Sequence, residues 1–300
     1  EVVNQGLNIS RAARVLHTSQ PAITKMIHAL ESELNVQLLV RVGPRIVSVT
    51  DEGASVVMFA RQVVQDVRNL RAAANDSKNA ATGEIRVATT NLQARYALLD
   101  PVRRFAHQYP DVKMTLRQGT PTQIAMWVSA GEVDIGISTV PASIPRNVLT
   151  LEAYALHRCI ITPLRHPLLK IKNPAIEHLK RYRFIAYDNQ FDTTSVVRRA
   201  FEAANVEPHI VLRTSDADLV KTYVSAGLGI GVIQRAAITS ADKSLRAINA
   251  DHLFTPSTAW ITVRKDLYLR RFMYDFITMV SPAWGRESID SMRAKHRGEG

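Results

Sequence analysis

The chain has 300 residues, 46% of them hydrophobic, a single cysteine and a formal net charge of +11. This length and composition predict two or three globular domains, and no apolar run reaches the roughly 20 residues that a membrane helix needs. One cysteine excludes an internal disulfide and is typical of the reducing cytoplasm. Because Cys159 lies in an apolar stretch, it is interpreted as a packing residue rather than a nucleophile.

The basic charge is spread along the chain and does not by itself locate a nucleic-acid site. Residues 1–80 contain nine lysines and arginines and seven acidic residues, so only +2 of the net charge falls there. A DNA site must therefore be argued from local geometry.

The first residues predict two helices in succession. Val2 and Val3 are interpreted as the end of a first, truncated helix whose beginning precedes the given sequence. Asn8 or Ser10 can cap a second helix over residues 11–17, because both side chains accept hydrogen bonds from the backbone of a first turn.

A third helix follows, capped by Thr18 or Ser19. Its apolar residues recur at helical spacing and are expected to face the core: Ile23, Ile27, Leu30 and Leu34. Its start and opposite side carry the candidates for DNA contact: Ser19, Gln20, Pro21, Thr24, Lys25 and His28. Glutamine can pair with adenine, threonine with a base or a thymine methyl, and lysine with guanine or phosphate. An ordinary solvated helix face is the alternative.

Two β-prone runs around Gly43 and Pro44 predict a hairpin after this helix. The hairpin carries Arg41 and Arg45, which are expected to grip phosphate or the minor groove. The order of helix, turn, helix and hairpin predicts a winged helix-turn-helix over residues 1–50. This order favours DNA binding by the third helix over the alternative that its polar side is only a solvent-exposed surface.

A long helix is expected to begin at Thr50. Its apolar residues recur at alternating steps of four and three, the pattern of a coiled-coil seam: Val56, Ala60, Val63, Val67, Leu70 and Ala74. Packing on its own domain is the alternative, but the polar stretch at 75–83 leaves few neighbours. Residues 51–82 are therefore interpreted as a dimerisation helix and linker.

From Gly83 onward strands and helices alternate, which predicts α/β sheets. Two lobes joined by two crossings are expected, the first from residues 83–161 and 267–300, the second from 162–266. Together they predict a clamp with a cleft between its lobes.

The "GLGIGV" segment is not interpreted as a dinucleotide site, because a helix precedes it and a strand follows it, the reverse of what that site requires. Gly227 is instead expected to end the preceding helix, and the glycines of the next strand to allow close packing. Neither a catalytic constellation nor a metal-ligand spacing is evident, so an enzyme is not predicted. Asp216 and Asp218 are interpreted as a helix cap and an acid in the first turn of that helix.

The stretch "NISRAARVLHTSQPAITKMIHALESELNVQLLVRVGPRIVSVTDEG" resembles the DNA-binding domain of LysR-type transcriptional regulators. Downstream, "TTNLQARYAL", "QGTPTQIA", "HPLL", "DADLVKTYVSAGLGIGVI" and "FMYDFI" are similar to the branch that contains the CysB and Cbl regulators of sulfur assimilation and sulfonate use. The resemblance implies two Rossmann-like lobes of the periplasmic-binding-protein type. It also implies that the protein binds promoter DNA, forms a homotetramer and binds a small effector instead of a cofactor. RNA polymerase is a possible further partner.

The implied effector site fits the residue pattern. Hydroxyl and amide side chains follow two strands of the first lobe, where free backbone N–H groups also converge. The candidates are Thr89, Thr90, Asn91, Gln93, Ser138 and Thr139, with Asp192 and Thr193 from the second lobe. Helix capping is the rival explanation for Thr89 and Thr90.

Two positions depart from the branch, which usually has threonine where this chain has Leu92 and Asp192. Leu92 removes a hydroxyl donor, and a carboxylate from Asp192 would repel a bound anion. Either Asp192 turns away and Thr193 or Thr194 substitutes, or the effector differs from sulfate and carries an amine, as O-acetylserine does.

The sequence thus predicts a cytoplasmic regulator of sulfur-metabolism genes that binds promoter DNA and responds to sulfate, O-acetylserine, N-acetylserine or a similar compound. A two-lobe solute-binding or enzymatic clamp without a role in transcription is the alternative. A DNA-binding protein with a vestigial cleft is a third hypothesis.

Overall fold

The computed structural model describes residues 1–43, 45–78, 82–141, 143–187 and 195–297. Its internal contacts divide the chain into two units, Glu1–Arg71 and Ala72–Gly300. Within the described ranges, no helix has the length and apolar character that spanning a membrane requires.

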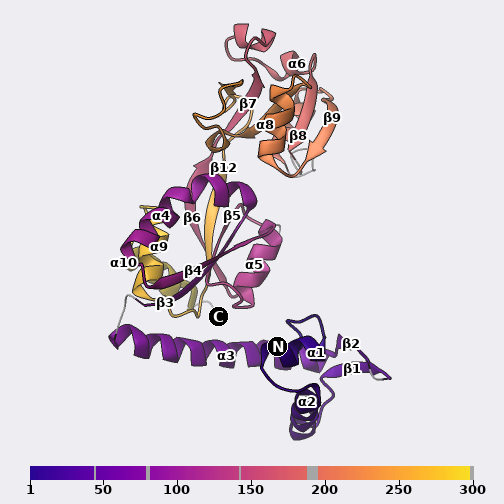
Figure 1. Cartoon of the computed structure of the whole chain (residues 1–300), viewed down its shortest axis with the longest axis vertical. Helices are drawn as coiled ribbons and strands as arrows, with labels where there is room; N and C mark the ends of the chain where they lie inside the picture. Colours follow the sequence, from indigo (N-terminus) through magenta and orange to yellow (C-terminus); the bar gives the residue numbers. More distant parts are fainter. Residues whose placement is uncertain (44, 79–81, 142, 188–194, 298–300) are drawn as a thin grey trace. The chain divides into compact units, whose positions relative to one another are not determined.

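The first unit contains the predicted winged helix-turn-helix (Figure 1). Its elements are α1 (Ile9–Val15), α2 (Gln20–Leu34), the antiparallel hairpin of β1 (Leu39–Val42) and β2 (Arg45–Val49), and the start of α3 (Asp51–Lys78). Asn8 caps α1 by accepting from the Arg11 amide at 2.8 Å, and Ser19 caps α2 by accepting from the Ala22 amide at 3.3 Å. Both caps were among the predicted pairs.

The residues before α1 adopt the hydrogen bonds of a helix end. The Leu7 amide donates to Val2 O at 2.9 Å and the Gly6 amide to Val3 O at 3.1 Å, with Gly6 at a φ of +64°. This pair of bonds is the Schellman motif, which needs a residue in the left-handed region. The predicted helix end at Val2 and Val3 agrees with it.

One prediction for α2 is wrong. Ile23 is buried and Ile27 half-buried, as expected, but Leu30 and Leu34 are 40% and 43% exposed. The reason is length, because α1 has 7 residues and α2 has 15, so α1 covers only part of the apolar side of α2.

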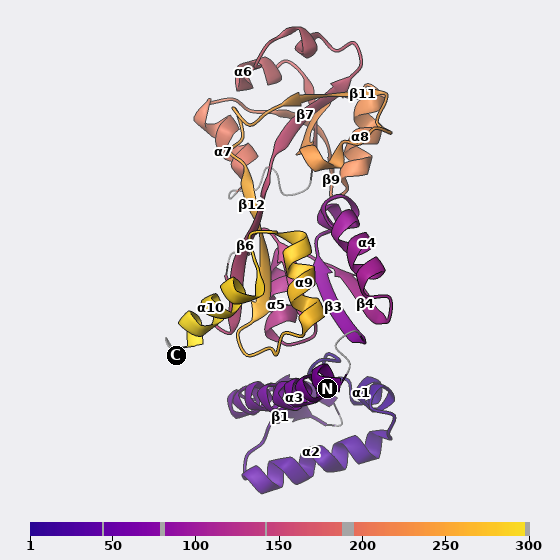
Figure 2. The same ribbon diagram turned by 90° about the vertical axis from the view of Figure 1, so that its left-hand side faces the viewer.

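The second unit holds two α/β lobes, each built on a five-stranded sheet (Figures 1 and 2). The first sheet has the order β4-β3-β5-β12-β6. Its strands are β3 (Gly83–Thr89), β4 (Val112–Gln118), β5 (Ile135–Ser138), β6 (Val148–Leu156) and β12 (Ser257–Arg264). One face is covered by α4 (Leu99–Gln108) and α9 (Arg271–Val280), with α10 (Arg286–Arg297) beside them, and the other by α5 (Pro121–Ser129).

The second sheet has the order β11-β7-β10-β8-β9. Its strands are β7 (Arg158–Pro163), β8 (Arg183–Tyr187), β9 (His209–Thr214), β10 (Ile230–Gln234) and β11 (Leu245–Asn249). Alternate residues of β8 face opposite sides: Phe184 packs with α7 (Val196–Ala203) and α6 (Ile176–Leu179), and Ile185 with α8 (Ala217–Ser225). Short helical turns complete the lobe at η2 (Pro167–Lys170) and η4 (Arg235–Ala237).

The passages between the lobes differ from the expected boundaries. Strand pairing assigns Arg158–Pro163 to the second sheet and Ser257–Arg264 to the first. The chain therefore leaves the first lobe at residue 157, not 162, and returns between residues 250 and 256, not at 267. Both strands are buried over most of their length and lack a regular alternation of buried and exposed residues, so periodicity alone could not assign them to a lobe.

Two smaller predictions are confirmed. Gly227 follows α8 with a φ of +82° and ends the helix, while the glycines of the next strand allow close packing, because a Cβ on Gly231 would lie 2.6 Å from Val220 Cγ1. Cys159 is buried, and its burial raises the pKa of the thiol to about 12, so the thiol is a packing group and not a nucleophile.

Candidate functional site

The start of α2 forms one continuous surface. Five of the predicted DNA-contacting residues line a single shallow depression: Gln20, Pro21, Thr24, Lys25 and His28. They come together because the spacing of Gln20, Thr24 and His28 repeats every four residues, one helical turn. Ser19 lies next to them as the helix cap. Ser10 Oγ on α1 donates to Gln20 Oε1 at 2.9 Å and thereby orients the amide of Gln20.

The two wing arginines have different environments. Arg45 is exposed on β2, as expected of a residue that contacts a DNA backbone. Arg41 is half-buried and its Nη1 lies 3.2 Å from Glu31 Oε2 on α2. Arg41 therefore ties the wing to α2.

Glu31 is a residue that sequence reasoning missed. Its carboxylate accepts from the Leu38 amide at 3.0 Å and from Arg41, and it lies 3.3 Å from His28 Nδ1. Burial alone would raise the pKa of Glu31, but the Leu38 amide and the Arg41 charge outweigh burial and hold it below its usual value. The sequence did contain a signal for this role, because Glu31 is an acidic residue on the otherwise apolar side of α2.

Apart from Val56, which is half-buried, the predicted apolar seam of α3 is uncovered in the single chain. Val63 and Leu70 are 61% and 71% exposed, and Val67, Ala60 and Ala74 are exposed as well. Phe59, which is also exposed, lies beside this seam on the helix and extends the surface. A contiguous exposed apolar surface of this kind is typical of a protein–protein interface.

The effector candidates of the first lobe lie at the carboxyl ends of two neighbouring parallel strands. Thr89 of β3 pairs with Ile137 of β5, so Thr90 and Ser138 follow at adjacent strand ends. Thr89 is fully buried and its Oγ1 donates to Ile137 O at 2.8 Å, while Ser138 Oγ donates to Thr139 O at 2.9 Å. Both hydroxyls therefore donate to backbone carbonyls and stabilise the strand ends.

Gln93 belongs to η1 (Gln93–Ala97), a π-helical turn directly after β3. The side chain is buried, and its Oε1 accepts a hydrogen bond from Tyr154 OH at 3.0 Å. Burial raises the pKa of Tyr154, so the phenol stays protonated and remains a donor. Thr90 and Thr139 are half-buried and Asn91 is exposed, while Asp192 and Thr193 lie outside the described residues.

Leu92 has a role that its residue type alone did not reveal. It is 5% exposed and packs into the apolar cluster of the second lobe that includes Ala217 and Val220 of α8. Leu92 therefore contributes an apolar contact between the lobes.

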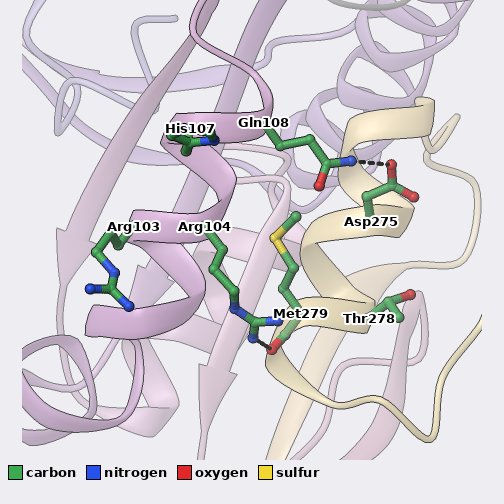
Figure 3. Close-up of a pocket in the computed structure, with 7 residues that line it drawn as sticks. All are labelled: Arg103, Arg104, His107, Gln108, Asp275, Thr278 and Met279. Atoms are coloured by element: carbon green, nitrogen blue, oxygen red, sulfur yellow. Dashed lines mark hydrogen bonds between the residues drawn. The ribbon is translucent and has the colours of Figure 1, made fainter.

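A second groove lies between α4 and α9 (Figure 3). It is lined by Arg103, Arg104, His107, Gln108, Asp275, Thr278 and Met279. Arg104 Nη2 donates to Met279 O at 2.7 Å, and Gln108 Nε2 lies 3.5 Å from Asp275 Oδ2. These bonds cross from one helix to the other, so the polar groups of the groove stabilise helix packing.

A capped second helix with a wing, followed by two α/β lobes with polar strand ends, defines the class of helix-turn-helix regulators with a two-lobe sensor. Two family models match the chain: the bacterial regulatory helix-turn-helix protein, lysR family, over residues 1–54, and the LysR substrate binding domain over residues 78–285. The chain belongs to the LysR family and is a transcriptional regulator, not an enzyme.

The similarity extends to the predicted branch. The CysB regulator of Haemophilus influenzae is 39% identical over 290 residues, which cover 97% of this chain and 90% of that protein. The SsuR regulator of Burkholderia cenocepacia is 38% identical over 283 residues, covering 94% and 92%. The cofactor-binding domain of the Cbl regulator superposes with a TM-score of 0.66 at 29% identity, over 71% of this chain and 94% of that domain.

Proposed function

We propose that the protein regulates sulfur-metabolism genes by reading promoter DNA with α2 in response to a small sulfur-related effector. The depression shared by Gln20, Pro21, Thr24, Lys25 and His28 carries the DNA part of this proposal. The similarity to CysB and SsuR supports the sulfur part. The alternative of a clamp without a role in transcription is not favoured, because the helix-turn-helix model matches residues 1–54.

Replacing Lys25 with alanine tests the DNA surface. Lys25 is exposed within the depression, and loss of one cationic contact to guanine or phosphate is expected to weaken promoter binding about tenfold at fixed salt. A gel-shift titration measures this affinity. Lys113→Ala, which removes an exposed lysine of β4, serves as the control and should bind as wild type. Wild-type affinity of Lys25→Ala would contradict the assignment of α2.

Two copies of the chain would pair through α3 in this proposal. The exposed seam supports pairing, because apolar residues at alternating four- and three-residue steps face one side of a helix. A dimer presents two reading helices to the two halves of a pseudo-palindromic site. A tetramer formed from two such dimers, and contact with RNA polymerase, extend the same proposal, which places the protein in the cytoplasm.

The effector would bind at the carboxyl ends of β3 and β5. Thr90, Gln93 and Thr139 supply hydroxyl and amide groups there, and such neutral donors suit an oxyanion such as sulfate. O-acetylserine fits the same donors through its carboxylate, and an effector with an amine would tolerate Asp192 better than sulfate does, should that residue face the site.

Replacing Thr90 with valine tests this site. The change preserves shape and removes one hydroxyl, so we expect the affinity for the effector to fall about tenfold. Calorimetric titrations with sulfate and with O-acetylserine measure the loss and show which compound binds. Thr115→Val, at an exposed position of β4, is the matched control. Equal affinities for both variants and the wild type would refute the site.

A further inference from the structure

The turn η1 of the first lobe contacts α8 of the second lobe through a polar network. Tyr96 OH donates to Asp218 Oδ1 and accepts from Lys221 Nζ at 3.1 Å. Arg95 pairs with the other carboxylate oxygen of Asp218. Asp218 was interpreted from the sequence only as an acid in the first turn of a helix. In the structure, both of its oxygens bind the opposite lobe.

Lys221 anchors this network in the second lobe. It is 8% exposed, and its Nζ lies 2.9 Å from Asp218 Oδ1, 3.1 Å from Asp242 Oδ1 and 2.9 Å from Ala237 O. A buried ammonium group needs such acceptors, because an unpaired buried charge is strongly unfavourable. Burial alone would raise the pKa of Asp242. The hydrogen bond from the Thr239 amide and the charge of Lys221 outweigh burial, so the pKa lies below its usual value and the carboxylate stays ionised.

Apolar contacts reinforce the polar ones. Leu92 and the ring of Tyr96 pack against the cluster of Ala217, Val220 and Ala237. The Lys221 Nζ also lies 5.1 Å from the centre of the Tyr96 ring, within the range of a cation–π interaction. Tyr96 therefore contributes both a hydroxyl and an apolar face to the contact between the lobes.

The same turn carries a proposed effector residue. Gln93 begins η1, and its carbonyl accepts from the Leu98 amide at 2.9 Å, five residues on. Such π-helical turns are rare and occur frequently at functional sites. Because Gln93 and Tyr96 share one turn, a ligand that moves Gln93 also moves the contact with α8.

We infer that Arg95, Tyr96, Asp218, Lys221 and Asp242 form an interlobe latch that holds the effector unit closed and couples closure to effector binding. The coupling part rests on the proposed function. An effector that binds the closed arrangement gains affinity from the latch, and by linkage it stabilises the latch in return.

Tyr96→Phe tests the latch because it keeps the ring and removes only the hydroxyl. Hydrogen exchange followed by mass spectrometry on the full chain reports opening without any ligand. We expect amides of η1 and of α8 to exchange about tenfold faster in Tyr96→Phe, since a hydrogen bond to a charged group is lost. Tyr223→Phe is the control, because Tyr223 lies on the same helix α8 and is exposed.

A second readout separates the latch from the effector. With inorganic sulfate as probe, the affinity of Tyr96→Phe should fall about tenfold relative to wild type and Tyr223→Phe. Asp218→Asn combined with Tyr96→Phe should add little to either single change, as for residues of one network. Unchanged exchange in Tyr96→Phe overturns the latch. Faster exchange in a protein that never binds sulfate upholds the latch and refutes sulfate as effector.

Discussion

Replacing Val63 and Leu70 of α3 with glutamate is expected to turn a dimer into monomers and to lower promoter affinity about 100-fold. In the single chain both side chains are largely exposed along the apolar seam. In a dimer each glutamate would be buried against the partner helix, where an unpaired carboxylate is strongly unfavourable. Loss of the dimer lowers promoter affinity because a monomer can bind only one half-site at a time.

Sedimentation analysis and gel-shift titration measure the two effects. Ser55→Glu places the same charge on an exposed position of α3 outside the seam and should leave both the mass and the affinity unchanged. If Val63→Glu with Leu70→Glu stays dimeric, α3 is not the dimer contact, and the seam must pack in some other way.

A second large effect is expected at Gly53, where α3 meets the segment before the wing. A Cβ at this position would lie 2.9 Å from the carbonyl carbon of Leu38, closer still to its oxygen, and 2.8 Å from Val49 Cγ1. That oxygen also accepts from the Thr50 amide at 3.1 Å. Gly53→Ala is therefore expected to push the first turn of α3 away from Leu38 and to destabilise the first unit by about 3 kcal/mol.

Thermal unfolding monitored by calorimetry measures this loss. A destabilisation of that size lowers the midpoint of the first unit by about 10 °C or more. Gly285→Ala is the matched control, because nothing lies within 4 Å of the added Cβ. Equal midpoints for the two variants would show that the Leu38 segment moves without cost.

Local signals predicted much of the fold. Caps at Asn8, Ser19 and Asp216, and the helix-ending glycine at Gly227, were identified because each depends on a few neighbouring residues. The alternation of strands and helices predicted both lobes for the same reason. The lobe boundaries were placed wrongly, since strand partners lie far apart in the sequence and periodicity does not specify them.

The candidate sites show the same division. The grouping of the five residues proposed to contact DNA could be predicted, because they share one helix and three of them follow a four-residue spacing. The pairing of Arg41 with Glu31, and of Tyr96 with Asp218 across 122 residues, depends on tertiary packing that no spacing encodes. The exposure of Leu30 and Leu34 was missed because an amphipathic pattern shows which side of a helix is apolar, and not how much of that side is covered.

The carboxylate of Glu31 has a consequence for how a duplex would be held. It joins α2 to the Leu38 backbone and to Arg41 of the wing, and these bonds hold the helix and the wing together. If Lys25 contacts a base edge and Arg45 a sugar-phosphate strand, as proposed, the bonds of Glu31 limit how far the separation between these two contacts can change. A duplex whose geometry differs from that separation would then have to deform to make both contacts. Operators whose base-pair steps bend or compress easily would therefore be bound with the smallest deformation energy.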